Sequence, residues 1–351
     1  MDDLLAARSQ MALSLGFHII FACIGMIMPF FMAISHYIYL KTGKEAYKKL
    51  TVAWSKGVAI FFVTGAVSGT MLSFELGLLW PKFMEEAGPI FGMPFSLEGT
   101  AFFIEAIALG FFLYGWGKFH PWFHWFTGVV VGVSGLASGI LVVAANAWMN
   151  APTGFDIIDG VYTNIDPIAA MLNEAWFSQA LHMTLAAFVA TGFAVGGIHA
   201  WMIRKGKSKD IHIPALRISL TIGAVASILM PLSGHHAAKD VAHRQPAKLA
   251  AMEAHFHTEE RAALIIGGIP DEATQTVNYA IKIPGGLSYL IHGDFVTEVK
   301  GLEDIPQDER PPVAMTHYGF QIMVGIGMLL MLVGLIWLFG LWKKSSYLHA
   351  P

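Results

Sequence analysis

The chain has 351 residues, 55% of them hydrophobic and only 13% charged, with a mean hydropathy of +0.56. These values lie outside the range of ordinary soluble domains and are typical of a membrane protein. The net charge of −3, with no basic run or phosphate-binding glycine loop, gives no indication of nucleic-acid or nucleotide binding. The single cysteine, Cys23, excludes a disulfide framework, a covalent haem attachment and a thiolate-bound iron–sulfur cluster.

Seven apolar segments are long enough to cross a bilayer, which needs about 20 mostly apolar residues. They cover residues 8–40, 51–80, 95–117, 122–148, 173–203, 214–234 and 316–342. The first is too long for a signal peptide and has no Ala-x-Ala cleavage site, so we expect it in the mature protein. The expected fold class is all-α, a polytopic membrane bundle of about seven helices. We expect its parts to be a six-helix bundle at 1–234, a loop at 235–315, and a seventh helix with a tail at 316–351.

The distribution of lysine and arginine predicts the orientation. These residues gather in the loops at 41–49 and 204–209 and in the tail at 343–344, which we therefore place in the cytoplasm. The loop at 149–172 has no lysine or arginine and three aspartates, and the long loop at 235–315 has seven basic and twelve acidic residues. The N-terminus and the long loop are thus expected outside and the C-terminus inside.

Three potential haem ligands lie inside the apolar segments. His18 and His182 each stand about ten residues, or roughly 15 Å, from the outer end of their helices. Each is either a histidine hydrogen-bonded within the bundle or a haem or metal ligand. Met323 lies at a comparable depth in the last helix; most of the 18 methionines are packing residues, but its depth matches that of His182. A histidine and a methionine facing each other would form a six-coordinate, electron-transferring haem site.

Ionisable residues inside a membrane are costly and indicate function. Glu98 and Glu105 are seven residues apart and share one helix face, which favours a proton relay or an acid beside a haem over a structural role. Glu75, near the outer end of the second segment, is ambiguous. His36, His120, His124 and His199, towards the cytoplasmic boundary, are expected at hydrated helix ends.

Eight ordered stretches together resemble subunit I of the cytochrome bd quinol:oxygen oxidases. They are "GFHIIFACIGM", "SGTMLSFELGLLWP", "FSLEGTAFFIEAIALG", "AANAWMNAPTGF", "LHMTLAAFVATG", "QPAKLAAMEAHF", "EVKGLEDIPQDERPPV" and "FQIMVGIG". The resemblance extends along nearly the entire chain.

The resemblance implies a role for each candidate residue. It implies that His182 and Met323 ligate the low-spin haem b558, and that His18 ligates high-spin haem b595 or haem d at the oxygen-reducing centre. By the same resemblance, Glu98 and Glu105 match acids near those haems and in the proton path. The outer loop then becomes the quinol-binding loop.

In that loop, Lys248 and Glu253 match the pair implicated in quinol oxidation. A carboxylate such as Glu253 can accept a proton as quinol loses two electrons, while Lys248 hydrogen-bonds the headgroup oxygen. From the residues alone, both would be ordinary charges on a solvated loop helix. We expect His243, His255 and His257, which have no ligand spacing, to be solvated loop histidines.

Two departures from the family pattern stand out. The usual subunit I continues for two more helices with a Gly-Arg-Gln-Pro-Trp motif and a haem-ligating glutamate, and that motif does not occur here. The missing helices are supplied by a second chain, removed by truncation, or lost in a divergent paralogue; we favour a natural short subunit. Second, Gln321 stands where the family often has arginine, which is expected to lower the potential of the nearby haem.

The expected function is that of a haem-containing subunit of a quinol oxidase in the respiratory chain. It would work with a second membrane subunit in a prokaryotic plasma membrane, with quinol and oxygen as substrates. The alternative is a non-catalytic or electron-entry paralogue that binds haem b and supports an oxidase subunit. A transporter would need internal repeats, which the sequence lacks.

Overall fold

The computed structural model describes residues 3–343, and within them seven helices are long and apolar enough to cross a membrane, as predicted. They are α1 (Asp3–Thr42), α2 (Glu45–Leu79), α3 (Pro81–Tyr114), α4 (Pro121–Asn150), α6 (Trp176–Arg204), α7 (Lys209–Arg244) and α10 (Val313–Trp342). The fold class is therefore all-α.

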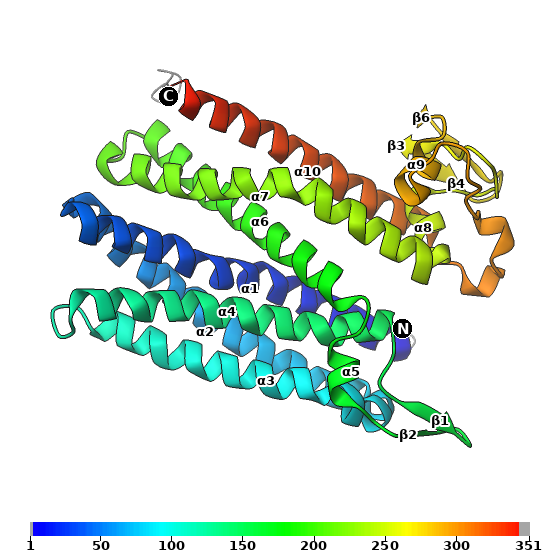
Figure 1. Cartoon of the computed structure of the whole chain (residues 1–351), viewed down its shortest axis with the longest axis horizontal. Coiled ribbons are helices and arrows are strands. Elements are labelled where there is room, and N and C mark those ends of the chain that lie inside the picture. The colour runs from blue at the N-terminus through cyan, green and yellow to red at the C-terminus, as the bar shows by residue number, and fades with distance from the viewer. Residues whose placement is uncertain (1–2, 344–351) are drawn as a thin grey trace. The chain divides into compact units, whose positions relative to one another are not determined.

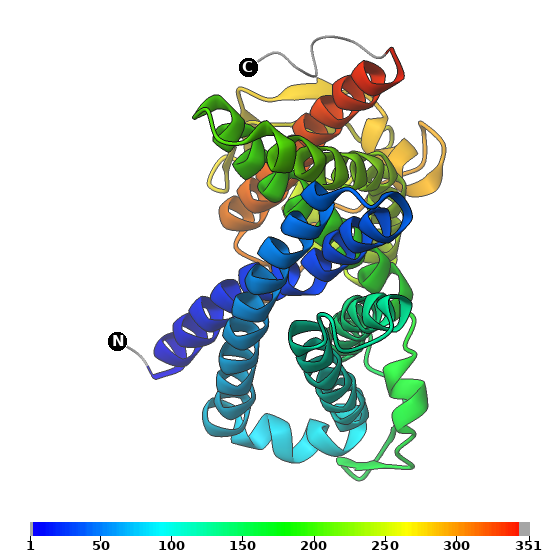
Figure 2. The ribbon, with the colours of Figure 1, turned by 90° about the vertical axis from the view of Figure 1, so that its left-hand side faces the viewer.

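Several helices continue beyond the apolar segments that predicted them. α7 extends to Arg244 and α3 begins at Pro81, so Trp80 alone separates α2 from α3. Pro81 suits the first helical position because its missing N–H would have no intrahelical partner there. Two internal prolines, Pro89 and Pro94, follow in α3. Figure 2 shows that the first part of α3, in cyan, runs in a different direction from the rest, as internal prolines cause.

Short elements fill the connections. The helices are α5 (Pro167–Met171), α8 (Pro246–Glu253), α9 (Gly286–His292) and the 3₁₀ turns η1 (Leu302–Asp304) and η2 (Gln307–Glu309). Three antiparallel ribbons join β1 (Asp156–Ile158) to β2 (Val161–Thr163), β3 (Leu264–Ile266) to β6 (Ile281–Ile283), and β4 (Ile269–Asp271) to β5 (Thr276–Asn278).

The chain forms two compact units, and the first contains the residues up to Ala226 together with those from Gly334 onward. In this unit α1 packs against α2, α4 and α6, and α3 lies along α4 (Figure 1). The core joins apolar side chains from α1, α2, α3, α4, α6 and α7; Phe31, Leu50, Phe112 and Val131 are among them and are fully buried. The helix bearing His18 is thus at the centre of the unit.

The second unit comprises Ser227–Val333. It contains the end of α7, the whole long loop and the first part of α10. One of its apolar clusters packs α8 against the turn η1 and the start of α10; it consists of Ala250, Ala251, Ala254, Phe256, Leu302 and Val313. The loop is therefore a folded structure with its own core.

Candidate functional site

His18 lies on the face of α1 that packs against α2. Its Nδ1 is 2.9 Å from the hydroxyl of Ser68, and the ring is half-buried. A Cβ at position 69 would come within 3.1 Å of the His18 ring, so Gly69 gives the imidazole the room it needs. The two helices are therefore shaped around this histidine.

The hydrogen bonds of Ser68 define the tautomer of His18. A serine hydroxyl has one hydrogen, and here the carbonyl of Thr64, 2.8 Å away, accepts it. Ser68 Oγ can then accept from His18 in the tautomer that carries its hydrogen on Nδ1, and in that tautomer Nε2 keeps its lone pair for another partner. A histidine that binds a metal has this arrangement, in which one ring nitrogen is fixed by a hydrogen bond and the other is the ligand.

Glu75, which the sequence left ambiguous, is buried beside the same two helices. One carboxylate oxygen accepts from the Ser14 hydroxyl at 2.6 Å and from the Gln10 amide at 3.3 Å. The other oxygen is buried and has no hydrogen-bond partner within the described range 3–343. Gln10, Ser14 and His18 follow at intervals of four along α1, so they form one polar row on the helix.

Glu98 and Glu105 project from α3 towards α4. Glu98 accepts a hydrogen bond from Ser138 at 2.7 Å. Glu105 is buried, and its carboxylate would meet a Cβ at Gly135 at 3.1 Å, so a glycine again makes room for a predicted site residue. The predicted shared face of the two acids agrees with this packing against a single helix.

His182 is half-buried in α6, and Met323 is 50% exposed in α10. They belong to different compact units, and their pairing stays a prediction. The donor set fits haem because imidazole nitrogen and thioether sulfur are the axial ligands of electron-transferring haems.

Glu253 ends α8 and is the least exposed of the predicted site residues, at 1%. Both of its carboxylate oxygens are buried, and neither has a hydrogen-bond partner among residues 3–343. Burial raises the pKa of Glu253 to about 7, because the charged form loses water and gains no replacement. A carboxyl with a pKa close to neutrality is suited to accept and release protons.

Lys248 lies on the same helix but is exposed, and no ion pair joins it to Glu253 within residues 3–343. Five residues of helix turn the two side chains well away from each other. The structure thus separates a buried acid from an exposed cation, and the two do not act as a salt bridge.

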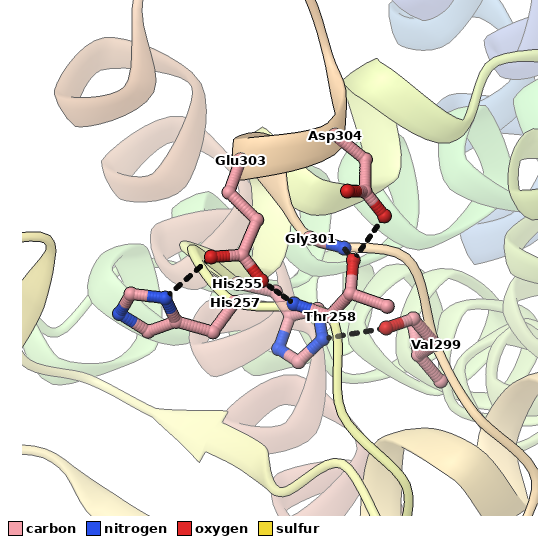
Figure 3. A network of polar contacts seen from close by, with 7 residues as sticks. All are labelled: His255, His257, Thr258, Val299, Gly301, Glu303 and Asp304. Carbon is pink, nitrogen blue, oxygen red and sulfur yellow. Dashed lines mark hydrogen bonds and ion pairs between the residues drawn. The ribbon is translucent and has the colours of Figure 1, made fainter.

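The residues after α8 are fixed by a polar network (Figure 3). Glu303 accepts from the His257 ring at 2.9 Å and from the backbone N–H of Thr258 at 2.6 Å, and the hydrogen bond from His257 is the main cause that lowers the pKa of Glu303. Thr258 donates its hydroxyl to Asp304 and accepts from the N–H of Gly301. A side chain at Gly301 would clash with the backbone of residue 257.

Two expectations about histidines were wrong. His255 is buried, and its Nε2 lies 3.1 Å from the carbonyl of Val299, so it is part of the loop core and not solvated. His36 and His124 are buried among aromatic rings that include Phe112 and Trp116, and not at hydrated ends. His243 and His257 are exposed, as expected.

Comparison with known proteins identifies the family. A family model described as "Cytochrome bd terminal oxidase subunit I" matches residues 6–350. The chain belongs to the cytochrome bd terminal oxidase subunit I family. The resemblance read from eight stretches of sequence is therefore confirmed, together with the enzyme class that it predicted. Membership implies haem cofactors and a multi-pass membrane protein that works in a complex.

Individual relatives of the bd oxidase family span more than this chain. A Bacillus subtilis (strain 168) protein provisionally named cytochrome bd menaquinol oxidase subunit I is 39% identical over 344 residues, which are 96% of this chain and 77% of that protein. The cytochrome bd ubiquinol oxidase subunit 1 of the same organism is 29% identical, over 96% of this chain and 75% of the relative. The solved bd oxidase of Geobacillus thermodenitrificans matches with a TM-score of 0.91 and 38% identity, over 97% of this chain and 79% of that chain.

Proposed function

We propose that this chain is the electron-entry and haem-binding subunit of a cytochrome bd-type quinol oxidase. In it, quinol would be oxidised at the long loop, and His18 would hold a haem of the oxygen-reducing centre. The observation that carries the proposal is Glu253, a buried carboxyl on the loop where the resemblance expects quinol, with no hydrogen-bond partner in the part of the chain that the structure describes. Burying such an acid costs folding free energy, and this cost indicates that its proton exchange serves a function.

At the loop, Glu253 accepts a proton from the quinol hydroxyl, and Lys248 contacts the headgroup from its exposed position. Oxidation of one quinol releases two protons and two electrons. His182 and Met323 would hold the low-spin haem b558, and His18 the haem b595 or haem d of the oxygen-reducing centre. When bound, haem supplies one-electron redox chemistry that no side chain of this composition offers.

Within the first unit, the chain's own residues handle protons and orient the ligand. Ser68 fixes the His18 ring so that Nε2 is available. Glu98, hydrogen-bonded to Ser138, and the buried Glu105 form a pair of acids that can take up and pass on protons. Because the loop is predicted outside, protons from quinol would be released there, while oxygen reduction takes protons from the cytoplasm.

The proposal also includes a second membrane subunit as the partner of this chain, and it places both in the lipid bilayer of a prokaryotic plasma membrane. Support comes from the family, whose description is that of one subunit of an oxidase. The alternative, a paralogue that binds haem b without an oxygen site, is separated from an oxidase by the haem content of the purified complex. Pigment extraction distinguishes haem d from haem b and counts both.

The test of electron entry is a reduced-minus-oxidised spectrum of the purified complex with His182→Ala or Met323→Ala. Each variant is expected to lose the low-spin haem b signal, because each removes an axial ligand. Met328→Ala is the matched control, since Met328 lies on the same helix and is also 50% exposed. An unaltered low-spin signal in both ligand variants would show that His182 and Met323 are not the ligands of this haem.

A further inference from the structure

Two side chains of α10, His317 and Gln321, bind the main chain of the loop at four points. The His317 ring, which is 0% exposed, lies with Nδ1 2.9 Å from the carbonyl of Met252 and Nε2 3.1 Å from the carbonyl of Gly267. The Gln321 amide donates to the carbonyl of Ile265 at 2.9 Å and accepts from the N–H of Gly267 at 3.0 Å. We call these two residues the α10 clasp.

The clasp binds the loop directly before Glu253. The last carbonyls of a helix have no partner within it. At the end of α8, the N–H of Ala254 donates to the carbonyls of Ala250 and Ala251. The next carbonyl, that of Met252, is in hydrogen-bond contact with the His317 ring. Met252 directly precedes Glu253, so His317 fixes the peptide from which the buried carboxyl leaves the backbone.

The geometry of the clasp is specific. His317 and Gln321 are four residues apart and thus share one face of α10. A neutral imidazole donates to one of the two carbonyls, and a protonated ring donates to both. Since the ring is buried, water cannot replace these bonds when the side chain is changed. An apolar residue at 317 therefore removes the hydrogen bond that the ring donates to the loop and leaves at least one loop carbonyl without it.

We propose that His317 and Gln321 are positioning residues of the quinol-oxidation site. They hold α8 and the 265–267 segment on α10, the helix that bears Met323, and so keep the Glu253 carboxyl in its buried place. This assignment rests on the proposed function, in which Glu253 takes the quinol proton. It also gives Gln321, at a position where arginine is frequent in the family, a task in binding the loop.

The test uses the purified complex with two single variants, His317→Phe and Gln321→Leu. Hydrogen exchange, followed by mass spectrometry, is expected to quicken in peptides covering 250–255 and 265–267. With a short-chain naphthoquinol or benzoquinol as substrate, kcat/KM is expected to fall about tenfold to 100-fold, as displaced catalytic groups cause. The low-spin haem spectrum is expected to stay unchanged, because neither residue is a proposed ligand.

Two further variants make the result decisive. His317→Gln keeps one donor, so it is expected to recover part of the loss and to serve if the phenylalanine variant does not fold. Tyr318→Phe, the neighbouring position on α10, is the matched control. If His317→Phe and Gln321→Leu match this control in exchange and in kcat/KM while Glu253→Gln lowers quinol oxidation, the clasp assignment is wrong and the proposed function stands. If Glu253→Gln oxidises quinol like the parent protein, the proposed function is wrong, and the assignment falls with it.

Discussion

A single hydroxyl determines what His18 can do. Ser68 gives its hydrogen to the Thr64 carbonyl and can accept one from His18 Nδ1, and in that tautomer Nε2 keeps its lone pair. Outer hydrogen bonds of this kind commonly change metal affinity by about 10–100-fold when they are removed. The serine is thus as much a part of the proposed haem site as the histidine that it orients.

Changing Ser68→Ala should therefore weaken haem binding at His18. We expect haem affinity to fall by about 10–100-fold, because the ring loses the bond that fixes its orientation. The measurement is the haem-to-protein ratio of the purified complex, together with the high-spin part of its difference spectrum. Ser73→Ala, on an exposed position of the same helix, is the control. Identical haem content in both variants would contradict the role of Ser68.

The pH dependence of quinol oxidation follows from Glu253. Burial raises its pKa to about 7, so the carboxylate that accepts a proton is lost as the pH falls through that value. At pH 6 only about a tenth of the groups are deprotonated, so kcat/KM is expected to fall about tenfold from its value well above pH 7. The pH profile of steady-state quinol oxidation measures this limb.

Glu253→Gln should remove the acid limb and lower kcat/KM by about 10²–10⁴-fold, which is the usual contribution of a positioned acid–base group. Glu260→Gln, an exposed acid of the same loop, is expected to keep both the limb and the rate. Persistence of the limb in Glu253→Gln would assign it to a different group.

At the scale of elements, hydrophobicity predicted the seven long helices, because a membrane span must satisfy its backbone internally. It did not predict their full length. α7 continues to Arg244 and α3 starts at Pro81, since a helix does not need apolar residues once it leaves the bilayer. The three short ribbons were also missed, because strands of three residues give too little alternation to detect.

The interior of the loop could not be read from the sequence. Two contacts join residues far apart in the chain: Thr258 with Asp304, and His317 with Met252. No local sequence spacing indicates such contacts. The burial of His255 was missed for the same reason, as was that of Glu253. The resemblance pointed to Glu253, but only the structure shows that its carboxyl has no hydrogen-bond partner among the described residues. The cost of an ionisable group in an apolar helix could have drawn attention to His317.

At the scale of the whole molecule, the charges of the loops predict which side each end of the bundle faces. Basic residues gather in the loops at 41–49 and 204–209, and acidic residues dominate 235–315. Short segments rich in lysine and arginine resist transfer across a membrane, so the two basic loops are predicted to stay in the cytoplasm. The long loop, and with it Glu253, is therefore predicted to lie outside, and under the proposed function quinol protons would be released on that side and contribute to a membrane potential without a pump.

This orientation can be tested with single cysteines in a Cys23→Ala background, because Cys23 is the only native cysteine. Tyr279→Cys places a thiol at a loop position that is 92% exposed, and Lys207→Cys places one at an exposed position between α6 and α7. In intact spheroplasts a membrane-impermeant maleimide is expected to label residue 279 and to spare residue 207 until the membrane is opened. The reverse pattern would place the loop in the cytoplasm, where protons from quinol could not add to the potential.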